Sequence, residues 1–315
     1  MEQVTFQVKP RKFLPLVSII IVNYNHSDVT CELIESLNKI TYPNFEIIVV
    51  DNQSPDDEPI IIKRTYPGVR LVKSPINYGF AAGNNFGMMT AQGKYILLLN
   101  FDTIVTKDFL EPLVNIMEAH SEIGAVSPKI RYFHTPDTIQ YAGYTTMNTL
   151  TLRNFAIGSH QIDRGQFNQS GETAYAHGAA MLVSMEVIKK VGMMSYAFFL
   201  YYEEADWCER IKRNGYKIYY VHESLVYHKE SIATGKMSFD KIYYLTRNRL
   251  IFMRRNILGF KFFIAVLYQI FIAIPRNSLR WLIKGKFDLF FAYYKAIGWN
   301  ITHLFDKEIF ENPML

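Results

Sequence analysis

The sequence predicts an α/β fold: a mixed, mostly parallel β-sheet flanked by helices, with a C-terminal helical extension. Short β-branched runs, such as residues 17–22 and 46–50, alternate with helical segments, which is the pattern of βαβ units. The charge also changes near residue 240. Residues 241–315 hold 12 Lys and Arg against four Asp and Glu, a balance of +8, so the first 240 residues carry −3 of the total charge of +5. We therefore expect two parts, residues 1–240 and a basic, aromatic extension over residues 241–315.

The composition of the 315 residues is that of a globular protein. Hydrophobic residues make up 49% and charged residues 20%, which excludes the disordered and fibrous classes. Cys31 and Cys208 are too few and too far apart in sequence for a disulfide scaffold or a zinc cluster. The first 16 residues contain no long apolar run. We therefore expect no secretory signal and a reduced, cytoplasmic protein.

Four strands are expected in the first hundred residues. Residues 17–22 form a continuous apolar run that suits a strand buried on both faces, and a helix capped by Ser27 or Asp28 should follow it. Pro43 breaks the chain before the second strand. The other elements expected here are strands at 46–50, 69–72 and 95–99 and helices at 59–66 and 81–92. Right-handed crossovers would make these strands parallel.

The alternation weakens in the next part of the chain. Residues 129–175 mix Tyr, Thr, Asn and Gly, which suits an insertion or a lid. Helices at 184–191 and 206–214 and a strand at 217–221 are expected after it.

Polar side chains follow three of the four early strands. Asn23 and Asn25 follow the first strand, the acidic loop 51–57 follows the second, and Asn100 and Asp102 follow the fourth. Ligands of such sheets bind beyond the carboxyl ends of the strands. The sequence therefore predicts a binding site at this rim, with a solvated polar rim as the alternative.

A loop rich in small residues, 77–87, follows the third strand. The chain lacks a Gly-x-Gly-x-x-Gly fingerprint after its first strand and a Walker A sequence, which argues against dinucleotide and P-loop sites. Small residues in loop 77–87 would let a ligand approach the backbone, and the amides that open the next helix would face a diphosphate. A tight turn that needs Gly for packing is the alternative.

Several carboxylates suit specific chemistry. Asp102 at a strand end suits Mg²⁺ or Mn²⁺, which borrow oxygens from substrate phosphates, although an Asx turn or a helix cap is the alternative. Glu203, Glu204 and Asp206 crowd together beside aromatic residues, which raises carboxyl pKa values and suits a general base. Asp206 also stands four residues before Arg210, the spacing of a structural ion pair.

These motifs, in this order, resemble family 2 glycosyltransferases, and most closely the bacterial rhamnosyltransferase and galactofuranosyltransferase-like branch. The matching segments are 17–25, 49–54, 77–85, 99–102 and 202–210. The resemblance spans residues 15–255. It implies a GT-A fold and an inverting transfer from a nucleotide-sugar with a divalent metal, Mg²⁺ or Mn²⁺.

The resemblance also implies roles for individual residues. Asp51 would contact the base or ribose of the donor, the 77–84 loop its diphosphate, and Gly178 the sugar. The implied donor-binding set is Asn23, Asn25, Asp51, Ser54, Asn77, Gly79, Phe80, Ala81, Gly83, Asn84, Asn100 and Gly178. Asp102 matches the metal-binding aspartate of the family's Asp-x-Asp element, in which Asn100 occupies the first position.

The catalytic base falls in the acidic cluster, where Glu204 aligns best and Glu203 and Asp206 are the alternatives. His228 matches a histidine that completes the metal shell in the galactofuranosyl relatives, with His222 as its alternative. In the implied mechanism, Glu204 takes the proton of the acceptor hydroxyl as it attacks the anomeric carbon. The metal and the loop amides stabilise the leaving nucleotide diphosphate.

The resemblance implies a dTDP- or UDP-linked donor, a rhamnose-like sugar, and a lipid-linked or polysaccharide acceptor in cell-surface glycan assembly, with no nucleic acid partner. A non-catalytic nucleotide-sugar-binding or membrane-scaffolding protein is the alternative from another class. A sugar nucleotidyltransferase would need a Gly-rich basic loop, which residues 23–27 do not supply.

The extension contains an apolar run, residues 257–274, with Lys261 as its single charge and Pro275 at its end. This length is marginal for a spanning helix, and basic residues follow it. We expect an amphipathic element that lies on the anionic inner face of the cell membrane. A spanning helix, a buried subdomain and a homodimer interface are the alternatives. Residues 277–281 half-resemble the Gln-x-x-Arg-Trp element of processive polysaccharide synthases, but the Gln is missing.

Overall fold

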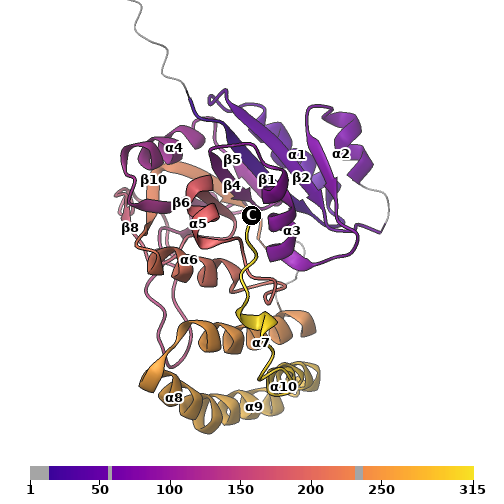
Figure 1. Ribbon diagram of the computed structural model, residues 1–315, viewed down its shortest axis with the longest axis vertical. Helices are drawn as coiled ribbons and strands as arrows, with labels where there is room; N and C mark the ends of the chain where they lie inside the picture. The colour runs from indigo at the N-terminus through magenta and orange to yellow at the C-terminus, as the bar shows by residue number, and fades with distance from the viewer. Residues whose placement is uncertain (1–13, 56–58, 231–236) are drawn as a thin grey trace, which may run out of the picture.

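The computed structural model describes residues 14–55, 59–230 and 237–315, and it has a sheet-containing part beside a layer of C-terminal helices (Figure 1). The strands are β1 (Val17–Asn23), β2 (Phe45–Asp51), β3 (Arg70–Lys73), β4 (Tyr95–Leu99), β5 (Thr103–Val105), β6 (Ile123–Tyr132), β7 (Ile139–Tyr141), β8 (Gly171–Glu172), β9 (Ala180–Ser184) and β10 (Lys217–His228). The helices are α1 (Ser27–Leu37), α2 (Pro59–Thr65), α3 (Gly79–Thr90), α4 (Leu110–Ala119), α5 (Met185–Val191), α6 (Glu203–Arg213), α7 (Phe239–Asn256), α8 (Gly259–Tyr268), α9 (Ile274–Ile283) and α10 (Phe287–Thr302).

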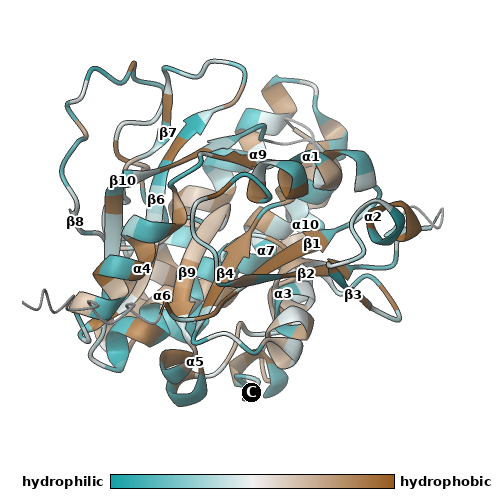
Figure 2. Ribbon diagram, turned by 90° about the horizontal axis from the view of Figure 1, so that it is seen from above, coloured by the Kyte–Doolittle hydropathy of each residue, from teal (hydrophilic) through white to brown (hydrophobic). Residues whose placement is uncertain are grey.

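The predicted mixed, mostly parallel sheet is confirmed. Its strand order is β3-β2-β1-β4-β9-β6-β10-β5, with β7 beside β6 and β8 beside β10. The four early strands pair in parallel, and β9 runs antiparallel between β4 and β6. Figure 2 shows the apolar strands β1, β2, β4 and β9 together in the middle of the sheet. Their side chains form the core because helices cover both faces of these strands.

Several predicted boundaries were wrong. The third helix begins at Gly79 rather than residue 81, and α6 begins at Glu203 rather than residue 206. Helix α1 begins at Ser27, so its N-cap is His26 and not Ser27 or Asp28, and the Ser27 side chain accepts a hydrogen bond from Asn23. The predicted strand 217–221 continues to His228, with a register shift after Val221.

The insertion predicted at residues 129–175 corresponds to the segment between β6 and β9, residues 133–179. The predicted bounds were wrong, since residues 129–132 belong to β6. The segment leaves and re-enters the sheet at neighbouring strands, since Ser127 of β6 donates a hydrogen bond to the carbonyl of Ala180. Asp163 anchors it through ion pairs with Lys129 at 2.9 Å and Arg131 at 2.6 Å. The Asp163 side chain is almost fully buried, and these partners hold its pKa at about 2 although burial opposes them.

The C-terminal helices form a layer of their own below the sheet (Figure 1). Helix α7 packs against α6 and α10, and α8 and α9 lie on its far side. The helical stretch does not end with the apolar run of residues 257–274 but continues through Pro275 to Ile283. A π-helical turn, Gln269–Ala273, joins α8 to α9, and Pro275 is tolerated in the first turn of α9.

One continuous helical stretch among the described residues, Gly259–Ile283, is long and apolar enough to cross a membrane. Its 25 residues include a window with a mean hydropathy of 1.5, of which 17% is buried. Length and composition alone define such a stretch, and core helices and signal sequences also satisfy them.

Candidate active site

Residues at the ends of β1 and β2 form a hydrogen-bonded set at the rim of the sheet. The backbone N–H of Asn25 donates to Ser54 Oγ at 2.9 Å, and the Ser54 N–H donates to Asp51 Oδ1 at 3.1 Å. Asn23 is buried and lies behind them, because its Oδ1 accepts a hydrogen bond from Thr30. The structure therefore brings together four residues of the predicted donor set. Asn25 Oδ1 is buried without a hydrogen-bond partner among the described residues, so it can accept one from a ligand. Two acids of the predicted 51–57 loop, Asp56 and Asp57, lie outside the described residues.

The loop before α3 is held by amide side chains. Asn77 Oδ1 accepts from Asn52 Nδ2 at 2.8 Å and from the Gly79 N–H at 2.9 Å. Gly79 has φ +81°, and a Cβ there would lie 2.1 Å from the carbonyl oxygen of Phe199. The Phe80 N–H donates to that same carbonyl at 2.7 Å. Gly79 is thus required by a backbone contact with the 199 segment, and the Phe80 amide is engaged in that contact.

Three other positions of this predicted donor loop pack against the sheet. Ala81 is fully buried, a Cβ on Gly83 would lie 2.8 Å from Val22 Cγ1, and Asn84 Nδ2 donates to the carbonyl of Phe80. Their side chains face inward because α3 packs directly on β1. This placement favours the packing interpretation of these three small or amide residues over direct contact with a diphosphate.

Asp102 and His228, the two predicted metal ligands, lie side by side. The chain brings them together because β5, which follows Asp102, pairs antiparallel with the end of β10. His228 Nε2 is 3.0 Å from Asp102 Oδ1, and His228 Nδ1 is 2.9 Å from Gln140 Oε1. Both side chains are more than nine-tenths buried. The alternative ligand His222 lies elsewhere, where its Nδ1 is 3.0 Å from Ser170 Oγ.

This donor set fits a small divalent cation. Ligand atoms at adjacent corners of an octahedron about 2.1 Å from an ion lie about 3 Å apart, which matches the Asp102–His228 distance. In the tautomer of His228 that carries its proton on Nδ1, Gln140 Oε1 accepts that proton, and the Nε2 lone pair points to the Asp102 side, where a cation would bind. Asn100 Oδ1 is buried with no hydrogen-bond partner among the described residues. No cluster of three or more His, Cys, Asp or Glu forms in the described part of the chain, so further ligands would come from substrate or water.

Glu203 and Glu204 occupy the first turn of α6. Tyr201 and Tyr202 before them both have left-handed backbone, with φ of 74° and 73°, a conformation that costs energy in non-glycine residues and clusters at functional sites. Burial raises the pKa of both carboxyls, and the Glu204 charge raises that of Glu203 further. The Oε2 atom of each is buried without a partner among the described residues.

Gly178 and His177 link Glu204 to the Asp102–His228 pair. A Cβ on Gly178 would lie 3.6 Å from Glu204 Cδ, so the predicted sugar-pocket glycine is in contact with the predicted base. The neighbouring His177 ring stacks on Tyr144 and meets the His228 ring edge-on, with centroids 5.8 and 6.1 Å apart. The Glu204 charge also raises the pKa of Tyr144, after burial, which is the larger cause.

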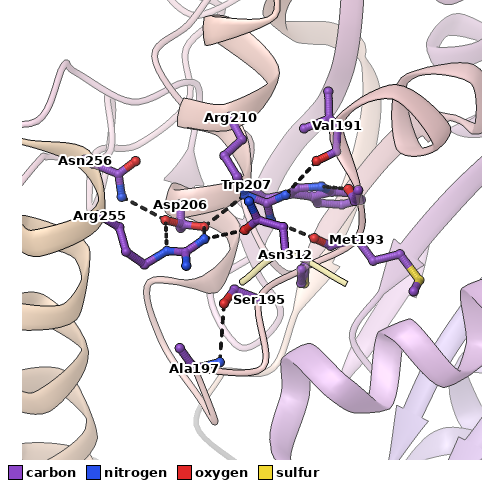
Figure 3. A network of polar contacts seen from close by, with 12 residues as sticks. Val191, Met193, Ser195, Ala197, Asp206, Trp207, Arg210, Arg255, Asn256 and Asn312 are labelled. Atoms are coloured by element: carbon purple, nitrogen blue, oxygen red, sulfur yellow. Dashed lines mark hydrogen bonds and ion pairs between the residues drawn. The ribbon is translucent and has the colours of Figure 1, made fainter. Parts of the chain in front are cut away.

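Asp206 lies in a different environment (Figure 3). Its two oxygens accept hydrogen bonds from Arg255 at 2.8 and 3.0 Å, from Arg210 at 3.1 Å and from Asn256 at 2.8 Å. Burial raises the pKa of Asp206, but its arginine partners outweigh burial and hold the pKa below its usual value. Because four donors already bind its two oxygens and keep it charged, the buried Asp206 carboxylate cannot take a proton from an acceptor hydroxyl. The ion-pair interpretation of Asp206 and Arg210 is confirmed, and Asp206 is not placed to act as a base.

A cavity of about 450 Å³ opens beside His228. Its lining residues are Tyr132, Phe133, His134, Thr135, Thr138, His160, His228, Lys229, Glu230 and Lys241. Aromatic and basic side chains thus surround the outer side of the Asp102–His228 pair.

Sequence reasoning missed Gln140, Tyr144 and His177. Each is a single polar or aromatic residue in a segment without periodicity, and only the folded chain brings it beside a predicted residue. Burial lowers the pKa of His177 to about 3, with repulsion from His228 as a smaller cause, so this ring is neutral. The 177–180 segment, whose small residues stand before a strand, was the one signal that pointed here.

Comparison with known proteins identifies the family. Residues 18–192 match the model of glycosyl transferase family 2, which covers more than half of the chain. An uncharacterised protein, y4gI, of Sinorhizobium fredii is 27% identical over 88% of this chain and 32% of its own length. The low-salt glycan biosynthesis hexosyltransferase Agl10 of Haloferax volcanii is 26% identical over 64% of this chain and 63% of its own length. The chain thus spans less than two thirds of both relatives.

Two solved structures share the fold. GalNAc-T7, solved with UDP, GalNAc and Mn²⁺, has a TM-score of 0.63 at 16% identity and covers 94% of this chain and 59% of its own. The mannosyltransferase PcManGT of Pyrobaculum calidifontis, solved with GDP-Man and Mn²⁺, has a TM-score of 0.55 at 15% identity. The match covers 92% of this chain and 76% of the PcManGT chain. These likenesses confirm the predicted GT-A fold. With its family-model match and its ordered rim motifs, this chain belongs to glycosyl transferase family 2.

Proposed function

We propose that this protein is an inverting glycosyltransferase that moves a hexose from a nucleotide-diphosphate donor to a hydroxyl of a glycan acceptor. The hexose we propose is rhamnose-like. The observation that supports it most is the placement of three parts near one edge of the sheet. Asp51 ends β2 and Asp102 follows the carboxyl end of β4, and both strands run parallel to β1. The Asn100 N–H donates to the carbonyl of Ala179, the residue after Gly178, and Gly178 lies beside the Glu204 carboxyl. The hexosyltransferase name of the Haloferax relative favours a hexose.

The donor nucleotide binds at the rim formed by β1 and β2. Asp51 Oδ2 and Asn25 Oδ1 offer acceptors for ribose hydroxyls or base amides, and Ser54 fixes their positions. We expect a dTDP- or UDP-linked donor. The mannosyl and GalNAc enzymes of like fold were solved with GDP- and UDP-linked ligands, so GDP-sugars belong in the same screen.

Asp102 and His228 would hold a divalent ion, Mn²⁺ or Mg²⁺, with Asn100 beside them. Such an ion supplies positive charge that neutralises the diphosphate of the donor. Gln140 orients the His228 ring through its Nδ1.

Glu204 acts as the general base. It accepts the proton of the acceptor hydroxyl while the hydroxyl oxygen forms a bond to the anomeric carbon and the bond to the nucleotide diphosphate breaks. The attack comes from the face opposite the leaving group, so the configuration inverts. The raised pKa suits a base that works near neutrality. Tyr144 and His177 border the sugar position and exclude water from it.

The acceptor is lipid-linked or a growing polysaccharide, at the cytoplasmic face of the cell membrane. Helices α8 and α9 and the π-helical turn between them support this placement, because five of their apolar side chains are more than half exposed: Phe260, Phe263, Phe271, Leu279 and Ile283. Such exposed apolar surface, bordered by Lys and Arg, suits the interface of an anionic bilayer. A homodimer interface would bury the same side chains.

The test is a donor screen with Mn²⁺ or Mg²⁺ present, read as nucleotide-diphosphate release and as product anomeric configuration. We expect release with one class of donor and loss of release in Asp102→Ala. Nucleotide binding without turnover for any donor, including dTDP-rhamnose, UDP- and GDP-sugars, would favour the non-catalytic binding protein. Retained configuration would reject the single displacement.

A further inference from the structure

The turn before α6 is held by a buried amide of α7. Asn248 Nδ2 donates to the carbonyl oxygens of Leu200 at 2.7 Å and Tyr201 at 2.9 Å. Its Oδ1 accepts a hydrogen bond from Arg247 Nε at 2.8 Å. The Asn248 side chain is fully buried, and burial of an amide is costly unless its polar atoms are paired. Both polar atoms of this side chain are engaged, so it has one defined position.

The residues on either side of Asn248 bind the same segment of chain. Arg247 Nη2 donates to the carbonyl of Ala197 at 2.7 Å, and Arg249 Nε donates to Tyr202 Oη at 3.0 Å. Three successive residues of α7 thus make four hydrogen bonds to a stretch that ends at Tyr202. Figure 1 shows α7 as the helix of the C-terminal layer that lies next to α6. The segment before α6 is therefore docked on α7.

This segment contains strained backbone. Tyr201 and Tyr202 have φ of 74° and 73°. Left-handed backbone at two successive non-glycine residues persists only where the surrounding structure over-determines it. The two bonds from Asn248 provide that constraint on one side of the turn. On the other side, the carbonyl of Phe199 accepts a hydrogen bond from the Phe80 N–H at 2.7 Å. The turn is therefore fixed between α7 and the start of α3.

The position of this turn decides where the catalytic carboxylate lies. Tyr202 is the N-cap of α6, and Glu204 is the second residue of that helix. Glu204 lies beside Gly178, where a Cβ would be 3.6 Å from Glu204 Cδ. If the turn relaxed to ordinary backbone, then the first turn of α6 would rotate and the Glu204 carboxyl would move away from Gly178. A displacement of about 1 Å is enough to slow an enzymatic reaction strongly.

We propose that Asn248 is a positioning residue for the transfer reaction: it holds the left-handed turn and thereby fixes the Glu204 carboxylate where it meets the acceptor hydroxyl. Asn248 touches no reacting atom in this role. The inference rests on the proposed function, in which Glu204 is the base, and adds a residue to it. A merely structural Asn248 would join α7 to the sheet-containing part without acting on the base.

The test compares Asn248→Ala with the wild type in steady-state kinetics, with circular dichroism and nucleotide binding as checks of folding. We expect kcat to fall by about tenfold to a hundredfold, because a misplaced base costs that much, while the donor KM changes by about twofold or less. The pH profile should change as well. Burial raises the pKa of Glu204, and a relaxed turn would admit water, so the acidic limb of kcat/KM should move down toward the ordinary value of 4.5. A merely structural role would leave this limb in place.

Two further variants isolate the hydrogen bonds of Asn248. Asn248→Asp keeps the size of the side chain and the acceptor for Arg247 Nε but has no N–H to donate, so it should lose as much kcat as Asn248→Ala. The matched control is Asn300→Ala. Asn300 is also buried and donates to two carbonyls, those of Arg247 and Ala296, but these bonds stay within α7 and α10. Its kcat should match the wild type. Wild-type kcat in both Asn248 variants, or an equal loss in Asn300→Ala, would overturn the proposal.

The proposed function can fail separately. If the wild type releases no nucleotide diphosphate with any donor, then that function is rejected, and the position of Glu204 is measured without turnover. The infrared band of the protonated carboxyl, identified by its loss in Glu204→Gln, is followed against pH in each variant. A midpoint that falls toward 4.5 in Asn248→Ala but not in Asn300→Ala supports the positioning role. Equal midpoints in the wild type and both variants would overturn it.

Discussion

At the scale of single residues, the adjacent carboxylates Glu203 and Glu204 differ in their surroundings. Glu204 contacts Gly178 and acts electrostatically on Tyr144, while the Glu203 side chain is almost fully enclosed. We predict that Glu204→Gln lowers the rate of transfer by about 10²–10⁴ while nucleotide binding is unchanged. Because a base must be ionised and burial raises this pKa, kcat/KM should fall as the pH drops through a value above the usual 4.5. A rate loss in Glu203→Gln with a normal rate in Glu204→Gln would move the base to Glu203.

Glu203 should instead limit stability. Burial raises its folded pKa well above 4.5, so both states are protonated at low pH. As the pH rises past 4.5, the unfolded state loses its proton first, and the free energy of unfolding falls by up to about 1.4 kcal/mol per pH unit until the folded pKa is reached. We predict that Glu203→Gln has a Tm at or below the wild-type value at pH 4.5 and above it at pH 7.5. A difference in Tm that does not change with pH would contradict this.

At the scale of elements, the helix after β3 is fitted closely to β1. We predict that Gly83→Ala lowers the free energy of unfolding by about 1–3 kcal/mol, because the new methyl group would lie 2.8 Å from Val22 Cγ1 in a packed core. The matched control is Gly298→Ala in α10. A Cβ there would meet no described atom within 4 Å other than its chain neighbours and the backbone of its own helix, and Ala should stabilise the helix by about 0.5–1 kcal/mol. Urea denaturation measures both. Equal effects of the two substitutions would show that α3 moves away from β1 at little cost.

The sequence correctly predicts those helices and strands whose local hydrophobic pattern matches the way they pack in the folded protein. The β-branched runs of β1, β2 and β4 have one plausible structure, and Asp51 and Asp102 follow from the rule that ligands bind at strand ends. The start of α6 was missed because Tyr201 and Tyr202 adopt left-handed backbone, for which their sequence gives no signal. His177 and Gln140 were missed because only the folded segment 133–179 brings them to His228. The continuation through Pro275 depends on a π-helical turn that tertiary contacts stabilise, including the bond from Gln269 to Leu150.

At the scale of the whole molecule, Asp206 joins the sheet-containing part to the C-terminal helices. It binds Arg255 of α7, and Arg255 in turn donates to the carbonyl of Ile309 and to Asn312 near the end of the chain. We predict that Asp206→Asn lowers the free energy of unfolding by about 3–5 kcal/mol, because two arginines are left buried without a counter-charge. The stability that Asp206 provides is present above its usual pKa of 3.8 and is lost as the pH falls through its lower folded pKa.

The control for this prediction is Glu35→Gln, which removes the exposed ion pair with Lys39 and should cost less than about 1 kcal/mol. Chemical denaturation near neutral pH measures both variants. If Asp206→Asn were no worse than Glu35→Gln, then the boundary at residue 240 would separate two parts that are stable independently.

The segment between β6 and β9 has a consequence for protein engineering. Its two ends emerge from hydrogen-bonded, antiparallel neighbours in the middle of the sheet, and Ser127 joins them across the gap. It nevertheless supplies Gln140, Tyr144, His177 and Gly178 to the pocket. We therefore predict that residues 133–179 can be exchanged between relatives. Chimaeras that take this stretch, which includes β7 and β8, would alter sugar choice while they keep the other eight strands, the nucleotide rim and Glu204.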